Sequence, residues 1–165
     1  MFFYLRSKFL IKVLFVCLGN ICRSPTAEGV FRNLVKREGL SEKIKVDSAG
    51  VGKWHVGEPP DRRATAAAKA RGIDISLQRA RQVEASDFAR FEYVIAMDQR
   101  NYHDLSHLCP NEGSRLYKFL HFAPNSDISD VPDPYYGGES GFSSVLDLIE
   151  VASVGLLEDI KSRYL

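Results

Sequence analysis

The sequence has few of the features that mark several large classes of protein. Its three cysteines are an odd number and too few for a disulfide framework, which favours a reducing compartment and a cytoplasmic location. It has no unbroken run of about 20 apolar residues, so we expect no membrane-spanning segment. The net charge is only +1, from 22 basic and 21 acidic residues. No broad basic field is therefore available to bind nucleic acid or a membrane surface.

Internal repeats, low-complexity tracts and linkers are also lacking, so we expect one domain. The chain of 165 residues is long enough for a hydrophobic core, and its 45% hydrophobic content is typical of a globular protein. The first nine residues mix apolar side chains with Arg6, Ser7 and Lys8, and no small-residue cleavage site follows them as in a signal peptide. We predict an N-terminal extension over residues 1–9 and a single domain over residues 10–165.

Short apolar runs alternate with helical patterns along the chain. Apolar runs predict strands at residues 10–16, 44–49, 93–97 and 116–120. Helical periodicity and start or stop signals predict helices at residues 24–39, 60–71, 86–91, 99–108 and 143–164. This alternation is typical of an α/β fold, so we expect three layers, with a twisted four-stranded parallel sheet between helices on both faces. Ligands of such sheets bind beyond the carboxyl ends of the strands.

Residues 16–25 read Val-Cys-Leu-Gly-Asn-Ile-Cys-Arg-Ser-Pro and join the first apolar run to the first helical pattern. A tight turn into a helix makes an anion cradle, because the first N–H groups are unpaired and the helix dipole favours negative charge there. Gly19 and Asn20 tolerate positive φ, so the loop can curl and point its N–H groups inward. Arg23 adds a planar guanidinium that matches two phosphate oxygens. These residues predict a phosphate loop.

Cys17 lies at the bottom of this predicted cradle. The positive field of a cradle favours the thiolate over the thiol, and the thiolate is the nucleophilic form of cysteine. Just beyond, we expect Ser24 to cap the first helix and Pro25 to take its first position. A nucleophile at the bottom of a phosphate-sized anion site indicates phosphoryl transfer to sulfur.

A general acid would assist the departing alkoxide or phenoxide, typically by roughly 10²- to 10⁴-fold. Residues 131–138, Val-Pro-Asp-Pro-Tyr-Tyr-Gly-Gly, lie in a long segment before the last helix, and loops of this length are more often functional than idle. Prolines on both sides of Asp133 restrict its backbone and hold its carboxyl group. Asp127 and Asp130 lack such flanking prolines. We therefore predict Asp133 as the acid.

The pattern Cys17-x5-Arg23-Ser24, followed by Asp133-Pro-Tyr-Tyr, resembles the low-molecular-weight protein tyrosine phosphatases from about Lys12 to the last helix. The resemblance implies hydrolysis of protein phosphotyrosine and aryl phosphates through a cysteinyl-phosphate intermediate. Cys17 would be the nucleophile and Arg23 the clamp that stabilises the transition state. Asp133 would protonate the leaving phenol and then activate water as a base. No metal or other cofactor is implied, because amides and Arg23 handle the phosphate charge.

The resemblance also implies how the phosphate is bound. Backbone N–H groups of the loop would hold it, and they belong to Leu18, Gly19, Asn20, Ile21, Cys22 and Arg23. The Ser24 hydroxyl would help to hold Cys17 as a thiolate, and Asn20 would shape the loop through a polar network that includes Ser48. Family members often carry a histidine in this network. Here Gln78 stands at its place, and it can hydrogen-bond but cannot carry a charge.

The aromatic part of the substrate would lie between Trp54 and Tyr135, with Tyr136 beside them. The physical requirement agrees, because a phenyl phosphate needs an aromatic slot above its anion site. The implied partners are phosphotyrosine proteins and phosphate or another oxyanion in the loop. We expect a monomer or a weak homo-oligomer.

Other functions share parts of this pattern. Arsenate reductases of the same fold need a further cysteine pair, but residues 76–96 contain none and Cys109 stands alone. Protein arginine phosphatases usually carry threonine where Ile21 stands, and Ile21 favours phosphotyrosine. A phosphopeptide-binding module without activity would have lost the nucleophile or the acid. His103 and His107 have a spacing that can bind zinc, but no third ligand lies at helical spacing.

Two further basic residues, Arg62 and Arg63, precede the alanine-rich segment. Isolated basic residues of this kind are typical of ordinary surface charge, which usually contributes little to stability. With Lys53, they could alternatively steer acidic phosphopeptides toward the site.

Overall fold

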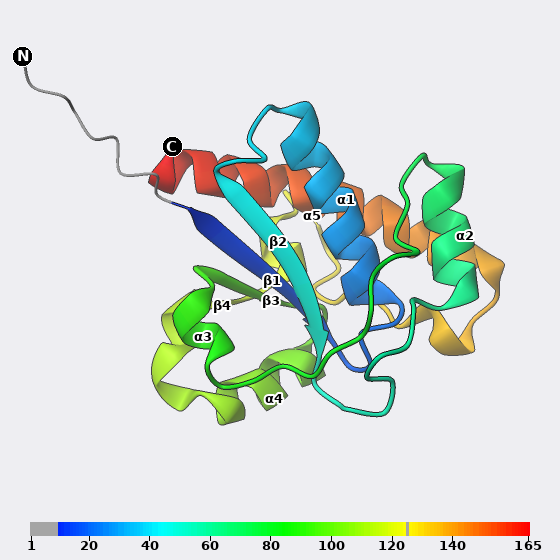
Figure 1. Ribbon diagram of the computed structural model, residues 1–165, viewed down its shortest axis with the longest axis horizontal. Helices are drawn as coiled ribbons and strands as arrows, with labels where there is room; N and C mark the ends of the chain where they lie inside the picture. The colour runs from blue at the N-terminus through cyan, green and yellow to red at the C-terminus, as the bar shows by residue number, and fades with distance from the viewer. Residues whose placement is uncertain (1–9, 125) are drawn as a thin grey trace, which may run out of the picture.

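The structure, a computed structural model, describes residues 10–124 and 126–165, so the extension predicted at residues 1–9 lies outside the described residues. Four parallel strands form one sheet in the order β2-β1-β3-β4 (Figure 1). The strands are β1 (Ile11–Cys17), β2 (Ile44–Gly50), β3 (Tyr93–Ala96) and β4 (Leu116–Lys118). The predicted four-stranded parallel sheet is confirmed.

Helices cover both faces of this sheet. They are α1 (Arg23–Arg37), α2 (Arg62–Ala70), α3 (Asp87–Arg90), α4 (Gln99–Leu108) and α5 (Glu139–Tyr164). Helices α1, α2 and α5 lie on one face and α3 and α4 on the other (Figure 1). Short 3₁₀ turns lie at Pro110–Arg115, Phe119–Phe122 and Pro134–Tyr136. The three-layer α/β fold is therefore confirmed.

The central strand β1 supplies side chains to both hydrophobic cores. Val13 and Phe15 pack on the side of α1 and α5, whereas Leu14 and Val16 pack on the side of α3 and α4. All four are fully buried, because successive side chains of a strand point to opposite faces. This is why β1 is a continuous apolar run rather than an alternating one.

Most predicted boundaries differ from the structure by one or two residues, and two differences have a clear physical cause. The fourth strand ends at Lys118, because a 3₁₀ turn takes over at Phe119–Phe122. The last helix begins at Glu139 and not near residue 143, so Ser144 and Asp147 lie inside it. The Ser144 hydroxyl donates to the carbonyl of Ser140 one turn earlier, a bond that a residue within a helix makes.

Helix α5 is the described helix that bears on the expectation of no membrane-spanning segment. By length and composition alone, Ser140–Tyr164 is long and apolar enough to be one. Its apolar residues are interspersed with polar ones, which is why no unbroken run appears in the sequence. In the structure its buried side chains contribute to the larger core, and they are Phe142, Val145, Leu146, Ile149, Ala152, Leu156, Leu157 and Ile160. The apolar face of α5 is thus occupied by the fold.

The carboxyl ends of β1, β2 and β3 meet at one edge of the sheet because the strands are parallel and in register. The loops that follow these ends therefore lie close together. Two of them are directly joined there, since the N–H of Val51 donates to the carbonyl of Cys17. Farther along, the N–H of Val131 donates to the carbonyl of Met97. This edge gathers the predicted site residues.

Candidate active site

The turn after β1 surrounds the Cys17 sulfur with polar groups. The backbone N–H of Asn20 donates to Sγ over 3.3 Å, and the Ser24 hydroxyl lies 3.0 Å from Sγ. Only 3% of Cys17 is exposed, so these groups face the sulfur in a site almost without solvent contact. Both can stabilise a negative charge on sulfur, as an activated nucleophile requires.

Asn20 provides the curl of this loop. Its φ of 57° lies in the left-handed region, which asparagine tolerates better than most residues. Its Nδ2 donates to Ser24 Oγ at 2.8 Å and to Ser48 Oγ at 3.0 Å. Its Oδ1 accepts the backbone N–H of Arg81 at 3.0 Å. The structure thus brings Asn20 and Ser48 together, and Arg81 is a further partner that the sequence did not reveal.

Gly19 does not adopt the positive φ that its position in the loop suggested. A Cβ on Gly19 would lie 3.1 Å from His55 Cδ2, so the His55 ring would have to shift by a few tenths of an ångström. At the end of β2, a Cβ on Gly50 would lie 3.0 Å from the Gly19 carbonyl carbon. These two glycines let the segment after β2 pack directly on the phosphate loop.

Helix α1 begins at Arg23 with Cys22 at the N-cap. Ser24 therefore does not cap the helix, and Pro25 is its third residue rather than its first. The prediction of a Ser24 cap was wrong because the curl of the loop brings the helix start forward. Ser24 lies inside the first turn, which leaves its hydroxyl facing the Cys17 sulfur.

The Arg23 side chain is 3% exposed and joins three segments. Its Nη1 donates to Asp98 Oδ2 at 2.6 Å and to the Val131 carbonyl at 2.9 Å, and its Nη2 lies 3.6 Å from Asp133 Oδ2. Burial lowers the pKa of Arg23, but the negative charges of Cys17 and Asp98 and the hydrogen bond to Asp98 outweigh it. The pKa therefore lies above its ordinary value, and the guanidinium remains charged beside the sulfur.

Asp98 is a functional neighbour that our sequence analysis missed. It lies two residues after the end of β3 and caps α4 by accepting the backbone N–H of Asn101 at 2.8 Å. Its other oxygen accepts from Arg23. A carboxylate at the carboxyl end of a buried parallel strand was the signal that could have found it.

Asp133 lies beside the Arg23 guanidinium and lines the same pocket as the phosphate loop. Its Oδ1 accepts the backbone N–H of Tyr135 at 3.0 Å, and 35% of its side chain is exposed. Asp130 forms an ion pair with Lys118 at 2.6 Å. Neither Asp127 nor Asp130 lines the pocket above Cys17, whereas Asp133 does. Position therefore favours Asp133 over the other two acids.

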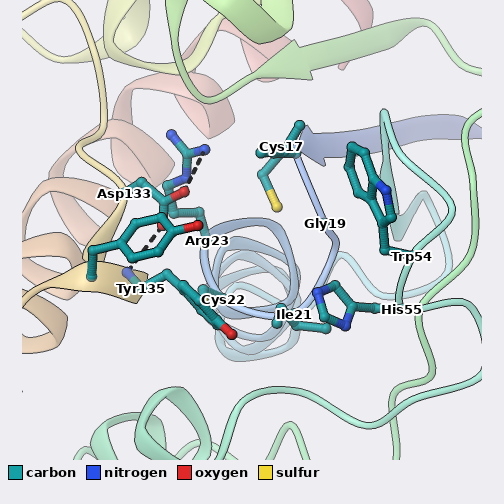
Figure 2. Close-up of a pocket in the computed structure, with 11 residues that line it drawn as sticks. Cys17, Gly19, Ile21, Cys22, Arg23, Trp54, His55, Asp133 and Tyr135 are labelled. Atoms are coloured by element: carbon teal, nitrogen blue, oxygen red, sulfur yellow. Dashed lines mark hydrogen bonds and ion pairs between the residues drawn. The ribbon is translucent and has the colours of Figure 1, made fainter.

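A pocket of about 290 Å³ opens above the sulfur. Its lining residues are Cys17, Leu18, Gly19, Ile21, Cys22, Arg23, Trp54, His55, Asp133, Tyr135 and Tyr136. Figure 2 shows Trp54 and Tyr135 on opposite sides of the Cys17 sulfur. The pocket thus has an anion-binding floor and aromatic walls, which suits a phosphate attached to a ring.

The rim of the pocket differs from its floor in exposure. Trp54 is 68% exposed and Tyr136 is 91% exposed, so these rings can meet a substrate but are weakly held. His55 also lines the pocket, and its Nδ1 lies 2.7 Å from Glu58 Oε2. His55 was missed because nothing in the motif places that loop residue beside Ile21.

A sequence profile described as "Low molecular weight phosphotyrosine protein phosphatase" matches residues 12–164. The chain belongs to this family. Among curated relatives, the low molecular weight protein-tyrosine-phosphatase YfkJ of Bacillus subtilis is 44% identical over 155 residues. The matched region covers 93% of this chain and 98% of YfkJ.

Solved structures of the family agree in fold. The crystal structure of Bacillus subtilis YfkJ matches with a TM-score of 0.90 and 42% identity, over 94% of this chain and 98% of that one. A tyrosine phosphatase of Entamoeba histolytica with Hepes in its active site has a TM-score of 0.89 and 41% identity, over 94% and 99%. Wzb of Escherichia coli K30, in complex with sulphate, has a TM-score of 0.81 and 28% identity, over 92% and 99%.

Behind the phosphate loop, this low molecular weight phosphatase carries a buried carboxylate that sequence reasoning overlooked. Glu28, on α1, is 5% exposed, and its Oε1 accepts the Ser48 hydroxyl at 2.8 Å. Burial raises its pKa above the ordinary value, although the Arg32 charge and the Ser48 hydrogen bond oppose that shift. Because Ser48 donates to Glu28, its oxygen is free to accept from Asn20 Nδ2.

Gln78 has a different partner from the one expected. Its Nε2 donates to the Pro25 carbonyl at 2.9 Å, so its hydrogen bond supports helix α1 rather than Asn20. Its buried Oε1 has no protein partner in the described part of the chain. The polar network of this phosphatase therefore uses the Arg81 backbone N–H and Glu28, while Gln78 lies beside it.

Within residues 10–124 and 126–165, no group of three or more His, Cys, Asp or Glu side chains could hold a metal ion. The His103 and His107 rings are tilted against each other, with centroids 4.3 Å apart and an interplanar angle of 49°. Cys22 shares the pocket with Cys17, and burial together with the charge of Asp61 raises its pKa above the ordinary value. In the phosphatase pocket this second thiol therefore stays protonated, unlike a nucleophile.

Proposed function

We propose that the protein hydrolyses protein phosphotyrosine and other aryl phosphate esters through a cysteinyl-phosphate on Cys17. One arrangement carries the proposal: the sulfur, the Arg23 guanidinium and the Asp133 carboxyl all line one pocket. Membership of the family supports phosphatase activity. The Hepes in the active site of the Entamoeba relative supports an oxyanion site at this position, since Hepes carries a sulfonate.

In the first step, the Cys17 thiolate attacks phosphorus and the bond from phosphorus to the phenolic oxygen breaks. Backbone N–H groups of the loop and the Arg23 guanidinium bind the three equatorial oxygens, whose charge is spread in the transition state. Asp133, protonated at this stage, gives its proton to the departing phenoxide. The products are free tyrosine hydroxyl and a phosphorylated sulfur.

In the second step, water attacks the phosphorus of the cysteinyl-phosphate. The Asp133 carboxylate accepts a proton from this water, and the sulfur–phosphorus bond breaks. Inorganic phosphate leaves and Cys17 returns as a thiolate, while Asp133 is again protonated. The Ser24 hydroxyl and the Asn20 N–H, at 3.0 and 3.3 Å from Sγ, stabilise the thiolate as it departs.

The direct test is phosphate release from a phosphotyrosyl peptide by the full chain and by the Cys17→Ser variant. We expect loss of roughly 10⁴-fold or more in the variant, because a hydroxyl lacks an activating base here. Acid quenching of the full chain during turnover should trap phosphate on Cys17, and mass spectrometry detects it. Turnover by Cys17→Ser at a comparable rate would overturn the mechanism.

Substrate choice needs its own measurement. We propose phosphotyrosine rather than phosphoarginine, because Trp54 and Tyr135 flank the sulfur and the apolar Ile21 lines the pocket. An arsenate reductase would need a resolving cysteine pair, yet residues 76–96 contain none. Comparing kcat/KM for phosphotyrosine and phosphoarginine peptides decides the first choice, and thioredoxin-dependent arsenate reduction tests the second.

We also propose that the enzyme works in the cytoplasm as a monomer or weak homo-oligomer. Cys17, Cys22 and Cys109 are all free, which supports a reducing compartment. Cys17, Arg23 and Asp133 all line one pocket of a single chain, so a monomer has every catalytic group of the proposed mechanism. Fractionation of the native cell and sedimentation of the purified chain test these two statements.

A further inference from the structure

Arg63 lies between the two halves of the active site. Its Nε and Nη2 donate to the carboxylate oxygens of Asp61, at 3.2 and 3.1 Å. Asp61 is itself fixed, because it caps α2 by accepting the backbone N–H groups of Arg63 and Ala64. The backbone N–H of Asp61 donates to the carbonyl of Ile21 at 2.8 Å. One end of the Arg63 guanidinium is therefore attached to the phosphate loop.

The other end of Arg63 reaches the segment that carries the acid. Its Nη2 donates to the Tyr135 carbonyl at 3.0 Å. The guanidinium carbon also lies 5.5 Å from the centre of the Tyr135 ring and 4.8 Å from that of Phe142 on α5. The N–H of Tyr135 donates to Asp133 Oδ1 (Figure 2). The residue that Arg63 holds is thus the residue that orients the Asp133 carboxyl.

The segment on the other side of Asp133 is held independently. Upstream, the Val131 N–H donates to the Met97 carbonyl and the Val131 carbonyl accepts from Arg23. These contacts fix the backbone two residues before Asp133. The Arg63 contact fixes it two residues after. With both sides held, the carboxyl has a defined place above the sulfur.

From these contacts we propose that Arg63 is a positioning residue, which couples the acid Asp133 to the phosphate loop through Asp61 and Tyr135. The inference rests on the proposed function of Asp133 as general acid. A guanidinium suits the role because its planar fork serves Asp61 and Tyr135 together while its charge lies over two aromatic rings. The hydrogen bond that Arg63 donates to Asp61 raises the pKa of Arg63, so its charge persists across working pH.

This role predicts a loss that depends on the leaving group. The contacts that define this role join Arg63 to Asp61, Tyr135 and Phe142, so we expect attack on phosphorus to continue when Arg63 is changed. Placement of the proton suffers, and misplacement by about 1 Å can cost roughly 10²-fold in an enzyme. The strongly basic phenoxide of a weakly acidic phenol needs the proton more than the weakly basic phenoxide of a more acidic phenol does.

The experiment compares kcat/KM for phenyl phosphate, whose phenol is a weak acid, and for p-nitrophenyl phosphate, whose phenol is more acidic. We expect Arg63→Gln to lower the value for phenyl phosphate by roughly tenfold or more, and that for p-nitrophenyl phosphate by less than about threefold. The inhibition constant of inorganic phosphate should stay within about twofold, because the cradle is intact. Arg62→Gln is the matched control, since it removes the same charge from an exposed neighbour.

Two further variants keep the proposal testable. Arg63→Lys keeps the charge but not the fork, so its losses should resemble those of Arg63→Gln. If one of these two variants folds poorly, the other still tests the proposal. In the Asp133→Asn background, Arg63→Gln should have little additional effect, because both act through one proton transfer. Equal losses for both substrates, rescue by lysine, or additive losses would each overturn the proposal. Failure of the proposed function is recognised separately, by an inactive wild type or an active Cys17→Ser.

Discussion

The phosphate loop, residues 17–24, and the acid segment, residues 131–137, form two sides of one pocket but are held very differently. In the loop, Asn20, Arg23 and Ser24 are each at most 3% exposed and bonded to several partners. In the acid segment, the Asp133 side chain is 35% exposed, and its ion-pair partner lies at 3.6 Å. The floor of the site belongs to the folded core, whereas the acid lies on the surface.

The difference has a physical consequence. A buried polar loop is stable only when every group is paired, so a change there should reduce both stability and activity. The partly exposed Asp133 side chain contributes little to stability, so changing it should reduce activity alone. Measuring the free energy of unfolding and the activity of each variant therefore tests whether the two regions contribute separately to stability and to catalysis.

Among the variants that compare the two regions, the largest effect is expected from Asp133→Asn. It should reduce kcat/KM for phenyl phosphate by roughly 10²- to 10⁴-fold, because the general acid is lost. The asparagine Oδ1 can still accept the Tyr135 N–H, so the free energy of unfolding should change by less than about 0.5 kcal/mol. Steady-state kinetics and urea unfolding measure the two quantities.

The control for this variant is the more acidic leaving group of p-nitrophenyl phosphate, which should lose much less. If both substrates lost activity equally, or if the variant unfolded at much lower urea, Asp133 would be a structural residue. The contrast between a stability-bearing phosphate loop and an acid that serves activity alone would then be wrong.

Asn20→Ala should show the opposite balance. The change removes three side-chain hydrogen bonds, with Ser24, Ser48 and Arg81, and puts alanine at a φ of 57°. At about 1 kcal/mol for each bond and for the backbone, we expect about 3–4 kcal/mol of lost stability. Urea unfolding measures it.

Asn20→Gly separates the two causes. Glycine adopts positive φ freely, so it should recover about 1 kcal/mol of the loss and leave the hydrogen-bond part. Alanine and glycine variants of equal stability would show that the backbone at residue 20 relaxes. A loss below about 1 kcal/mol in both would show that the loop does not depend on this network.

The same contrast explains what the sequence could predict. Cys17, Asn20 and Arg23 lie within a short stretch, so their chemistry can be inferred from local order of residue types. The strand before them and the helix after them follow from periodicity. Asp133 was also predictable, because its flanking prolines mark a rigid segment.

The partners of those residues depend on the folded chain. Asp98 and Arg63 are separated in sequence from the groups they hold, and either charge is ordinary when read in its own segment. Glu28 occupies a helix, where a buried carboxylate has no local signature. Ser24 was misassigned because serine before proline is typical of a helix start, and only the tertiary curl of the loop gives its hydroxyl to sulfur.

Glu28→Gln should produce a smaller effect that depends on pH. Burial raises the pKa of Glu28 above its ordinary value of 4.5, so the folded chain binds its proton more tightly than the unfolded chain. Its contribution to stability is therefore complete below pH 4.5 and is lost as pH rises through the folded pKa. Glutamine does not ionise. As pH rises to 7, the free energy of unfolding of the variant should therefore increase relative to that of the wild type.

Urea unfolding of both proteins at matched ionic strength measures this difference at several pH values. Arg32, 2.7 Å from Glu28 Oε2, is the opposing charge, so Arg32→Gln should enlarge the shift. A change in favour of the wild type with rising pH would mean that Arg32 stabilises the carboxylate more than burial penalises it. The phosphate-loop side would then contain a favourable buried charge pair.

Gln78→Met should have the smallest effect. The change removes the hydrogen bond to the Pro25 carbonyl, which would cost about 1 kcal/mol alone, but it also removes a buried Oε1 without a protein partner. The two contributions oppose each other, so stability should stay within about 1 kcal/mol and kcat/KM within about twofold. A large loss of activity at unchanged stability would contradict the structure, because it would require the amide to act on Asn20. Gln78 would then belong to the network that shapes the loop, and the floor of the site would extend farther from the sulfur than Ser48 and Arg81.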